Sequence, residues 1–208
     1  TGRLNGESWH ERNSGLTTAA VYTIAITSTG SVFAGTDDGI YRSTDAGDHW
    51  VGANNGLTST FINAITIAPS GSLFVATGGG GVFRSVDNGE NWDQTISGLD
   101  ATVVLSLATD ARGALYAGTD GSGVYRSMDN GESWSKINTG LLNTAVLSLS
   151  VDGGGAIYAG TRGGGVFRSV NQGNSWTGTN NLLNSKSVYA LVAHAKGNLY
   201  AGTESGVF

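Results

Sequence analysis

Short apolar stretches alternate with turns along the whole chain, and the pattern is clearest between residues 21 and 53. Apolar side chains fall on alternate positions there, and Gly, Asp and Ser separate the stretches at intervals of about 8 to 12 residues, as in antiparallel sheets. This unit predicts four strands: Val21 to Thr27, Ser31 to Thr36, Ile40 to Ser43 and His49 to Ala53. The first two strands recur four more times, and no helical period competes with them. The chain is therefore predicted to be all-β.

The predicted first strand has a bulky side and a small side. In the unit above, Tyr22, Ile24 and Ile26 form the bulky set, and Thr23 with Ala25 forms the small set. Sheets with two such faces pack against copies of themselves, bulky side against small side. The second strand carries an aromatic residue two positions before Gly or Ala in every unit, and this strict recurrence predicts core packing and not a row of ligand-binding rings. These aromatics are Phe33, Phe74, Tyr116, Tyr158 and Tyr200.

One motif, S-x-D-x-G-x-x-W, precedes the last strand of each unit. It is complete in three units and has Asn in place of Asp in a fourth. A degenerate copy, Asn5 to Trp9, lies near the start of the chain. The motif residues are Ser43, Asp45, Gly47 and Trp50; Ser85, Asp87, Gly89 and Trp92; Ser127, Asp129, Gly131 and Trp134; and Ser169, Asn171, Gly173 and Trp176. Including Trp9, the tryptophans are 41, 42, 42 and 42 residues apart. The chain is therefore a tandem repeat of about 42 residues.

The chemistry of the motif predicts a structural turn. An Asp carboxylate can accept hydrogen bonds from backbone N–H groups further along the turn, and Gly adopts positive φ at little cost. The Trp then contributes a large apolar area that holds the turn against its own unit. A calcium-binding loop is a poorer interpretation, because the further oxygen ligands and the distal bidentate Glu of an EF-hand are missing.

The motif resembles the Asp-box, or BNR repeat, of sialidases, xyloglucanases, sortilin-type receptors and photosystem II assembly factors of the propeller type. This resemblance implies a β-propeller in which the motif is a structural turn on the outer part of each blade, remote from the ligand site. It also implies an extracellular or periplasmic location.

The spacing of the units predicts a ring of five four-stranded antiparallel blades in one domain, residues 1–208. Placing Thr1 after Phe208 continues the repeat, and the five Trp spacings then become 41, 42, 42, 42 and 41, which account for all 208 residues. The segment from Thr1 to about Arg12 would supply the outermost strand of the last blade and close the ring, which removes exposed sheet edges. An open solenoid is the alternative, but no polar capping unit is visible.

Composition excludes several classes of protein. The net charge is −5, only 13% of residues are charged, and no basic cluster exists, so nucleic-acid binding is not expected. No apolar stretch approaches membrane-spanning length, and no membrane insertion is expected. Cysteine is absent, which removes disulfides and thiolate chemistry, and the 34 glycines suit many tight turns. The chain does not begin with Met, which suggests a processed or excised segment, and the expected oligomeric state is a monomer.

The resemblance implies that the turns between the second and third strands, together with the links between blades, form the face that usually carries ligands in such propellers. The charges of these turns differ from unit to unit while the frame repeats. The charged residues there are Asp37, Asp38, Asp120, Arg162 and Glu204. Such variation on a constant frame is expected of a functional face, and it is equally expected of unconstrained turns.

Catalysis is not predicted. Glycoside hydrolysis needs two carboxyl groups at a defined separation across a cleft, and the turns are too short to enclose one. The arginines Arg42, Arg84, Arg126 and Arg168 hold one equivalent position before the motif and are predicted to be structural, not a sialidase-type cluster. The three histidines are isolated and show no zinc-ligand spacing, so neither a metal nor a cofactor is expected.

The sequence therefore predicts a non-enzymatic scaffold that binds an unidentified protein or glycan. The similarity of the units indicates recent duplication or design from one unit. The alternatives are a lectin-like propeller, with sugar sites in the links between blades such as Asn54-Asn55, Asn138-Thr139 and Asn180-Asn181, or a glycosidase.

Overall fold

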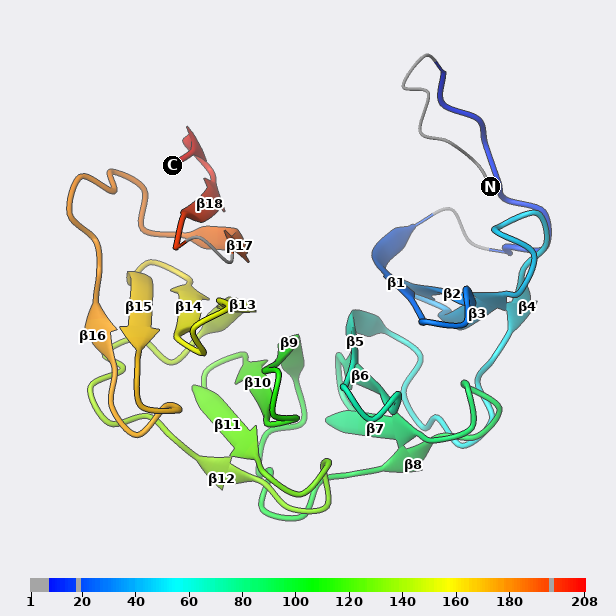
Figure 1. Ribbon diagram of the computed structural model, residues 1–208, viewed down its shortest axis with the longest axis horizontal. Coiled ribbons are helices and arrows are strands. Elements are labelled where there is room, and N and C mark those ends of the chain that lie inside the picture. The colour runs from blue at the N-terminus through cyan, green and yellow to red at the C-terminus, as the bar shows by residue number, and fades with distance from the viewer. Residues whose placement is uncertain (1–7, 18–19, 195–196) are drawn as a thin grey trace.

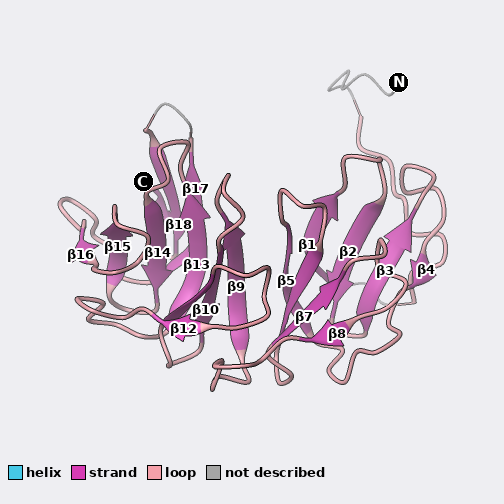
Figure 2. Ribbon diagram, turned by 60° about the horizontal axis from the view of Figure 1, so that its bottom comes forward, coloured by secondary structure: helices cyan, strands magenta, loops and turns pink. Residues whose placement is uncertain are grey.

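The computed structural model describes residues 8–17, 20–194 and 197–208. These described residues form strands and turns but no helix, and the strands make five antiparallel sheets (Figure 2). The predicted all-β class is therefore confirmed. Each sheet is one blade, and the blades follow one another around an arc with their first strands on the inner side and their shortest strands on the outer side (Figure 1). None of the described residues belongs to a helix that could cross a bilayer.

Within each blade the strands are neighbours in the order of the chain. Blade 1 contains β1 (Val21–Ile26), β2 (Val32–Thr36), β3 (Gly39–Ser43) and β4 (Val51–Gly52). Blade 2 contains β5 (Ile62–Ile67), β6 (Leu73–Thr77), β7 (Val82–Ser85) and β8 (Asp93–Gln94). Blade 3 contains β9 (Val104–Thr109), β10 (Leu115–Thr119), β11 (Val124–Ser127) and β12 (Ser135–Lys136). Blade 4 contains β13 (Val146–Val151), β14 (Ile157–Thr161), β15 (Gly165–Ser169) and β16 (Thr177–Gly178). Blade 5 contains β17 (Val188–Ala193), β18 (Leu199–Thr203) and β19 (Gly206–Val207).

The inner strands lie within one residue of their predicted positions in blade 1, whereas the predicted fourth strand, His49 to Ala53, shrinks to Val51–Gly52. The backbone N–H groups of the first two predicted residues bond elsewhere. The backbone N–H of His49 donates to the Asp45 carboxylate at 2.9 Å, and that of Trp50 donates to the Ser14 carbonyl at 2.8 Å. These residues therefore cannot pair with β3.

The blades pack bulky side against small side, as the alternation predicted. On the small side of blade 1, a Cβ at Gly35 would lie 2.6 Å from Ile62 of blade 2, so the second strand has no room for a side chain there. The equivalent contact joins Gly118 of blade 3 to Val146 of blade 4. The recurring aromatics are buried in blades 1 to 4, and the core consists of clusters that each join neighbouring blades.

The two ends of the arc do not meet (Figure 1). Blade 5 has three strands among the described residues, and residues 8–17 form no strand. The predicted closing strand, Thr1 to about Arg12, falls in large part on residues 1–7, which lie outside the described residues. Five blades in a propeller arrangement are confirmed, whereas closure by the N-terminal segment stays a prediction.

Candidate functional site

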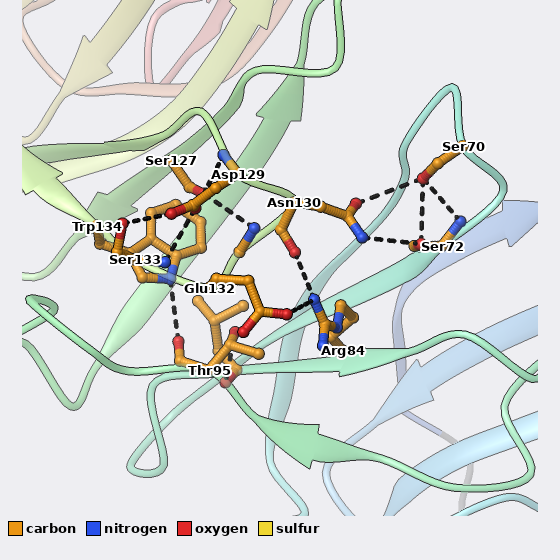
Figure 3. A network of polar contacts seen from close by, with 12 residues as sticks. Ser70, Ser72, Arg84, Thr95, Ser127, Asp129, Asn130, Glu132, Ser133 and Trp134 are labelled. Atoms are coloured by element: carbon orange, nitrogen blue, oxygen red, sulfur yellow. Dashed lines mark hydrogen bonds and ion pairs between the residues drawn. The ribbon is translucent and has the colours of Figure 1, made fainter.

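The S-x-D-x-G-x-x-W motif and its Asn variant form the same turn, called here the box turn, in blades 1 to 4, and Figure 3 shows the one in blade 3. In blade 3 the Asp129 carboxylate accepts hydrogen bonds from the Ser127 hydroxyl at 2.7 Å and from the Ser133 backbone N–H at 2.9 Å. The Ser127 hydroxyl oxygen in turn accepts from the Gly131 backbone N–H at 2.9 Å, and Gly131 has a φ of 87°. The Ser and Asp side chains of the motif thus hold the turn by bonding to each other and to its backbone.

The box turns of blades 2 to 4 are each tied to the preceding blade through their Trp. The indole Nε1–H of Trp134 donates to the Thr95 carbonyl at 3.0 Å, and its backbone N–H donates to the Ser97 carbonyl at 2.8 Å. Equivalent indole bonds run from Trp92 to Ala53 and from Trp176 to Ile137. The box turn therefore connects blades, a role that the sequence analysis had limited to its own unit.

The arginines that precede the motifs of blades 1 to 3 each bind the box turn of the next blade. Arg84 Nη1 donates to the Asn130 carbonyl at 2.9 Å and to Glu132 at 2.6 Å (Figure 3). Arg42 and Arg126 donate to the carbonyls of Asn88 and Gln172 in the same way. These three arginines hold blades together, in agreement with the structural role predicted for them.

The hydrogen bonds of the box turn lower the pKa of its carboxylates. Donation from the His49 backbone N–H, and then from the His49 ring and Ser43, lowers the pKa of Asp45 from 3.8 to about 2. In blade 2, the Asn91 side chain is the main cause that lowers the pKa of Asp87 from 3.8 to about 2. The pKa of Asp129 is also lowered, chiefly by the Ser133 hydroxyl. Asn171 makes the corresponding bonds in blade 4 without a charge.

We expect the Asp87→Asn variant to lose less stability than the wild type between pH 3.8 and about 2. A carboxylate whose folded pKa is lowered stabilises the fold above its unfolded pKa, and this contribution disappears as the pH falls through the folded pKa. The amide at residue 171 shows that Asn can make the same turn bonds. Urea midpoints measured from pH 5 to pH 2 test this, with Asp93→Asn, an exposed carboxylate of β8, as the control for net charge. Parallel curves for the wild type and Asp87→Asn would contradict the expectation.

The predicted ligand-face residues lie on exposed turns. Arg162 Nη1 is 3.0 Å from Asp120 Oδ1, and this ion pair joins the turn of blade 4 to the turn of blade 3. Asp38 lies 3.5 Å from the hydroxyl groups of Thr17 and Tyr41, and Glu204 lies 3.5 Å from the Ser185 hydroxyl. Asp37 is exposed in the same turn as Asp38. Among the described residues, no three His, Asp or Glu side chains gather as a metal site requires.

The outer rim carries two equivalent hollows that sequence reasoning identified only in part. One, of about 340 Å³, is lined by Arg42, Val51, Asn54, Asn55 and Glu90 among others. The second, of about 310 Å³, is lined by residues 42 positions later, including Arg84, Asp93, Ile96, Ser97 and Glu132. The Asn54-Asn55 link was a predicted sugar-binding candidate, whereas the Arg–Glu pairs beside it follow only from the packing of one blade on the next.

An arc of antiparallel blades, joined by box turns and presenting variable turns on one face, defines a β-propeller domain. Residues 73–180, just over half of the chain, match the model of the DUF6242 beta propeller domain, and the chain belongs to this family. No curated protein matches the sequence.

Solved structures share the fold at low sequence identity. The extracellular domain of the putative one component system BT4673 from B. thetaiotaomicron matches 91% of the chain with a TM-score of 0.75 and 20% identity. The GH74 xyloglucanase from Xanthomonas campestris matches 92% of the chain with a TM-score of 0.75 and 20% identity. YCF48 bound to D1 peptide matches 97% of the chain with a TM-score of 0.76 and 17% identity. The chain spans 27%, 34% and 68% of these structures, respectively.

Proposed function

We propose that this propeller domain is a non-enzymatic binding scaffold that takes a protein partner on its turn face. The observation that carries the proposal is the contrast between the frame and the turns. The box turns and the arginines before them bind one another with the same geometry in successive blades. The turn face instead differs from blade to blade, and its charged side chains are exposed. A scaffold that repeats while one face varies is suited to recognition.

The charge of the turn face favours a basic partner. Four of its five charged candidates are acidic, and the fifth, Arg162, is already paired with Asp120. Complementary charge accelerates association and weakens with salt. We therefore propose a partner with a positively charged surface segment, bound more weakly at high ionic strength.

The solved structures support the same type of role. YCF48 is described as bound to D1 peptide, and the BT4673 structure is the extracellular domain of a putative one component system. From this likeness we propose an extracellular or periplasmic location for the domain and recognition of a protein segment in place of catalysis.

Carbohydrate binding at the outer rim is the second candidate. It is favoured by the two equivalent hollows, where Arg and Glu side chains recur 42 residues apart on successive blades, beside Asn54 and Asn55 in the first hollow and Gln94 and Ser97 in the second. Repeated polar hollows could each accept the same sugar. This candidate predicts several equal sites, whereas the turn face predicts one.

Two charge-matched variants distinguish the candidates. The turn variant carries Asp37→Asn, Asp38→Asn, Asp120→Asn and Glu204→Gln. The rim variant carries Glu90→Gln, Asp93→Asn and Glu132→Gln in the hollows, and Asp48→Asn at the position equivalent to Glu90 in the box turn of blade 1. We expect pull-down from the source organism to recover a salt-sensitive protein partner with the wild type and the rim variant, but not with the turn variant. A multivalent glycan-array signal that only the rim variant loses would establish the second candidate. Turnover of xyloglucan or a sialoside that the turn variant lacks would refute both.

A further inference from the structure

A polar pocket of about 250 Å³ lies between blades 3 and 4, on the face that carries the box turns. Strands of a blade alternate in direction, so the turn between the first and second strands lies on the same face as the box turn, and the turn face lies opposite. The pocket shares no residue with the rim hollows. The residues that line it include Asp110, Arg112, Asp152, 153–155, Val170 and Gln172.

A side-chain bridge occupies the equivalent place between the earlier blades. The Asn130 side-chain N–H of blade 3 donates to the Ser72 hydroxyl of blade 2 at 3.3 Å, and the Ser70 hydroxyl donates to Asn130 Oδ1 at 3.4 Å (Figure 3). Asn88 of blade 2 donates in the same way to the Ser31 hydroxyl of blade 1 at 3.2 Å. Each bridge ties a box turn to the first turn of the blade before it.

Both partners of the bridge are replaced between blades 3 and 4. Ala114 stands 42 residues after Ser72 and has no hydroxyl group, and Gln172 stands 42 residues after Asn130. Within the part of the chain that the structure describes, the Gln172 side chain makes no hydrogen bond, and only its backbone carbonyl accepts one, from Arg126. Gln172 has a φ of 59°, a left-handed conformation that suits Asn better than Gln. This interface therefore accepts strain and loses a bridge, which packing alone does not explain.

The turn of blade 4 leaves the pocket open because it consists of glycines. A Cβ at Gly155 would meet nothing within 4 Å, and a Cβ at Gly154 would meet only Asp152 Oδ1, at 3.3 Å. The equivalent turn of blade 3 carries Ala111 and Arg112. Blade 4 thus provides space opposite the side chains that blade 3 provides.

The blade 3 side of the pocket carries opposite charges that do not pair. The Arg112 guanidinium makes no hydrogen bond or ion pair to any residue that the structure describes. Asp110 Oδ1 accepts from the backbone N–H groups of Arg112 and Ala114, each at 2.9 Å, whereas Oδ2 accepts none from the described residues. The pocket therefore holds a donor of positive charge and an acceptor of negative charge, both available to a ligand.

The Tyr116 hydroxyl is a buried donor next to these charges. Tyr116 corresponds to Tyr158 of blade 4, whose hydroxyl donates to Asp152 Oδ2 at 3.1 Å. The Tyr116 hydroxyl is also buried, but it has no hydrogen-bond partner among the described residues. Burial, and then the negative charge of Asp110, raise the pKa of Tyr116 to about 12, so the carboxylate lies near the hydroxyl. Buried polar groups nearly always have partners, so this wall of the pocket has a bonding capacity that the fold does not use.

The charges of the pocket select the class of ligand. An anion would be repelled by Asp110 and Asp152, a cation would be repelled by Arg112, and a neutral sugar would leave the charges uncompensated. A zwitterion matches both signs, because a guanidinium binds a carboxylate through two N–H groups and a carboxylate accepts from an ammonium group. Pockets for drug-sized ligands have about 300 to 1,000 Å³. The smaller volume here, about 250 Å³, fits one amino acid better than a peptide or an oligosaccharide.

We propose that the pocket between blades 3 and 4 binds a free α-amino acid. Arg112 holds its carboxylate, Asp110 and the Gln172 side-chain oxygen hold its ammonium group, and Val170, which is 69% exposed, contacts its side chain. The replacement of the bridge by Ala114 and Gln172 makes the room for it. This site goes beyond the proposed function and does not depend on the partner of the turn face.

Titration of the chain with each common free L-amino acid, followed by amide NMR, tests the inference. We expect at least one amino acid to shift the signals of residues 153–155 and Gln172 in a saturable manner. Its Nα-acetyl and carboxamide derivatives, which each lack one of the two charges, should not bind. The inference is overturned if no amino acid binds, if the derivatives bind as well as the parent, if the shifts lie elsewhere, or if monosaccharides alone produce them.

One pair of variants tests the charge. Arg112→Gln should weaken binding about tenfold or more, because it removes a charge-assisted hydrogen bond to the carboxylate. Lys136→Gln removes the same charge from β12, outside the pocket, and should leave the affinity unchanged. Equal affinities for Arg112→Gln and the wild type would refute the assignment of the carboxylate.

A second pair of variants tests the missing bridge. Ala114→Ser with Gln172→Asn restores the arrangement of blades 2 and 3, and it should abolish binding without lowering the urea midpoint. The reciprocal variant, Ser72→Ala with Asn130→Gln, removes a bridge where no such charges stand, and it should not add a second site. Undiminished binding by the first variant, or a second amino-acid site in the reciprocal variant, would contradict the proposed origin of the pocket.

Discussion

Replacing Trp134 with Ala is expected to lower the free energy of unfolding by about 3–5 kcal/mol, the usual cost of truncating a buried Trp. Trp134 is almost completely buried, and it packs in a cluster that joins blade 2 to blade 3. The substitution creates a cavity where the indole ring was and removes the hydrogen bond from the indole N–H to the Thr95 carbonyl. Urea unfolding followed by circular dichroism measures the loss.

The matched control is Met128→Ala in the same box turn. Met128 lies in the variable second position of the motif and is exposed, so its truncation should change stability by no more than about 0.5 kcal/mol. Equal losses for the two variants would mean that the box turn, and not the packing of the indole between blades, carries the stabilisation.

Replacing Phe74 with Ala is expected to cost a similar amount, about 3–5 kcal/mol, through a different contact. Phe74 is fully buried in β6, and the space for a Cβ at Gly131 of the next blade is taken by the edge of its ring, at 2.7 Å. Truncation therefore empties the space under the box turn of blade 3. The loss should appear in urea midpoints and in faster amide exchange of the residues around Gly131.

Val86→Ala is the control for this variant. Val86 lies in blade 2 near Phe74 in the chain but is exposed, and its truncation should be nearly neutral. If amide exchange in the box turn of blade 3 were unchanged in Phe74→Ala, the proposed coupling of neighbouring blades through this ring would be wrong.

Local chemistry explains why much of the fold could be predicted from residues alone. The alternation of apolar and polar residues predicted the positions of β1 to β3, because successive side chains of a strand point to opposite faces of the sheet and a buried face therefore repeats every two residues. The motif predicted the positions of the box turns, because Asp supplies an acceptor for the backbone N–H groups of the turn and Gly adopts the positive φ that the turn requires. The fourth strand of blade 1 was predicted too long, because the Trp50 backbone N–H bonds to the Ser14 carbonyl of another unit, and nothing in the strand's own sequence signals that bond.

The candidate site was less predictable for the same reason. The charged turn residues were identified as a set, but the pairing of Asp120 with Arg162 depends on the distance between blades 3 and 4.

The sequence by itself determined the unit: its strands, its turn, its bulky and small sides, and its five copies. Only the tertiary structure decided how far the copies curve around the axis, and it left the ends of blades 1 and 5 apart. The physical reason is that burial is a property of each interface and repeats with the sequence, whereas closure depends on the sum of small rotations over all interfaces. No single residue pattern encodes that sum.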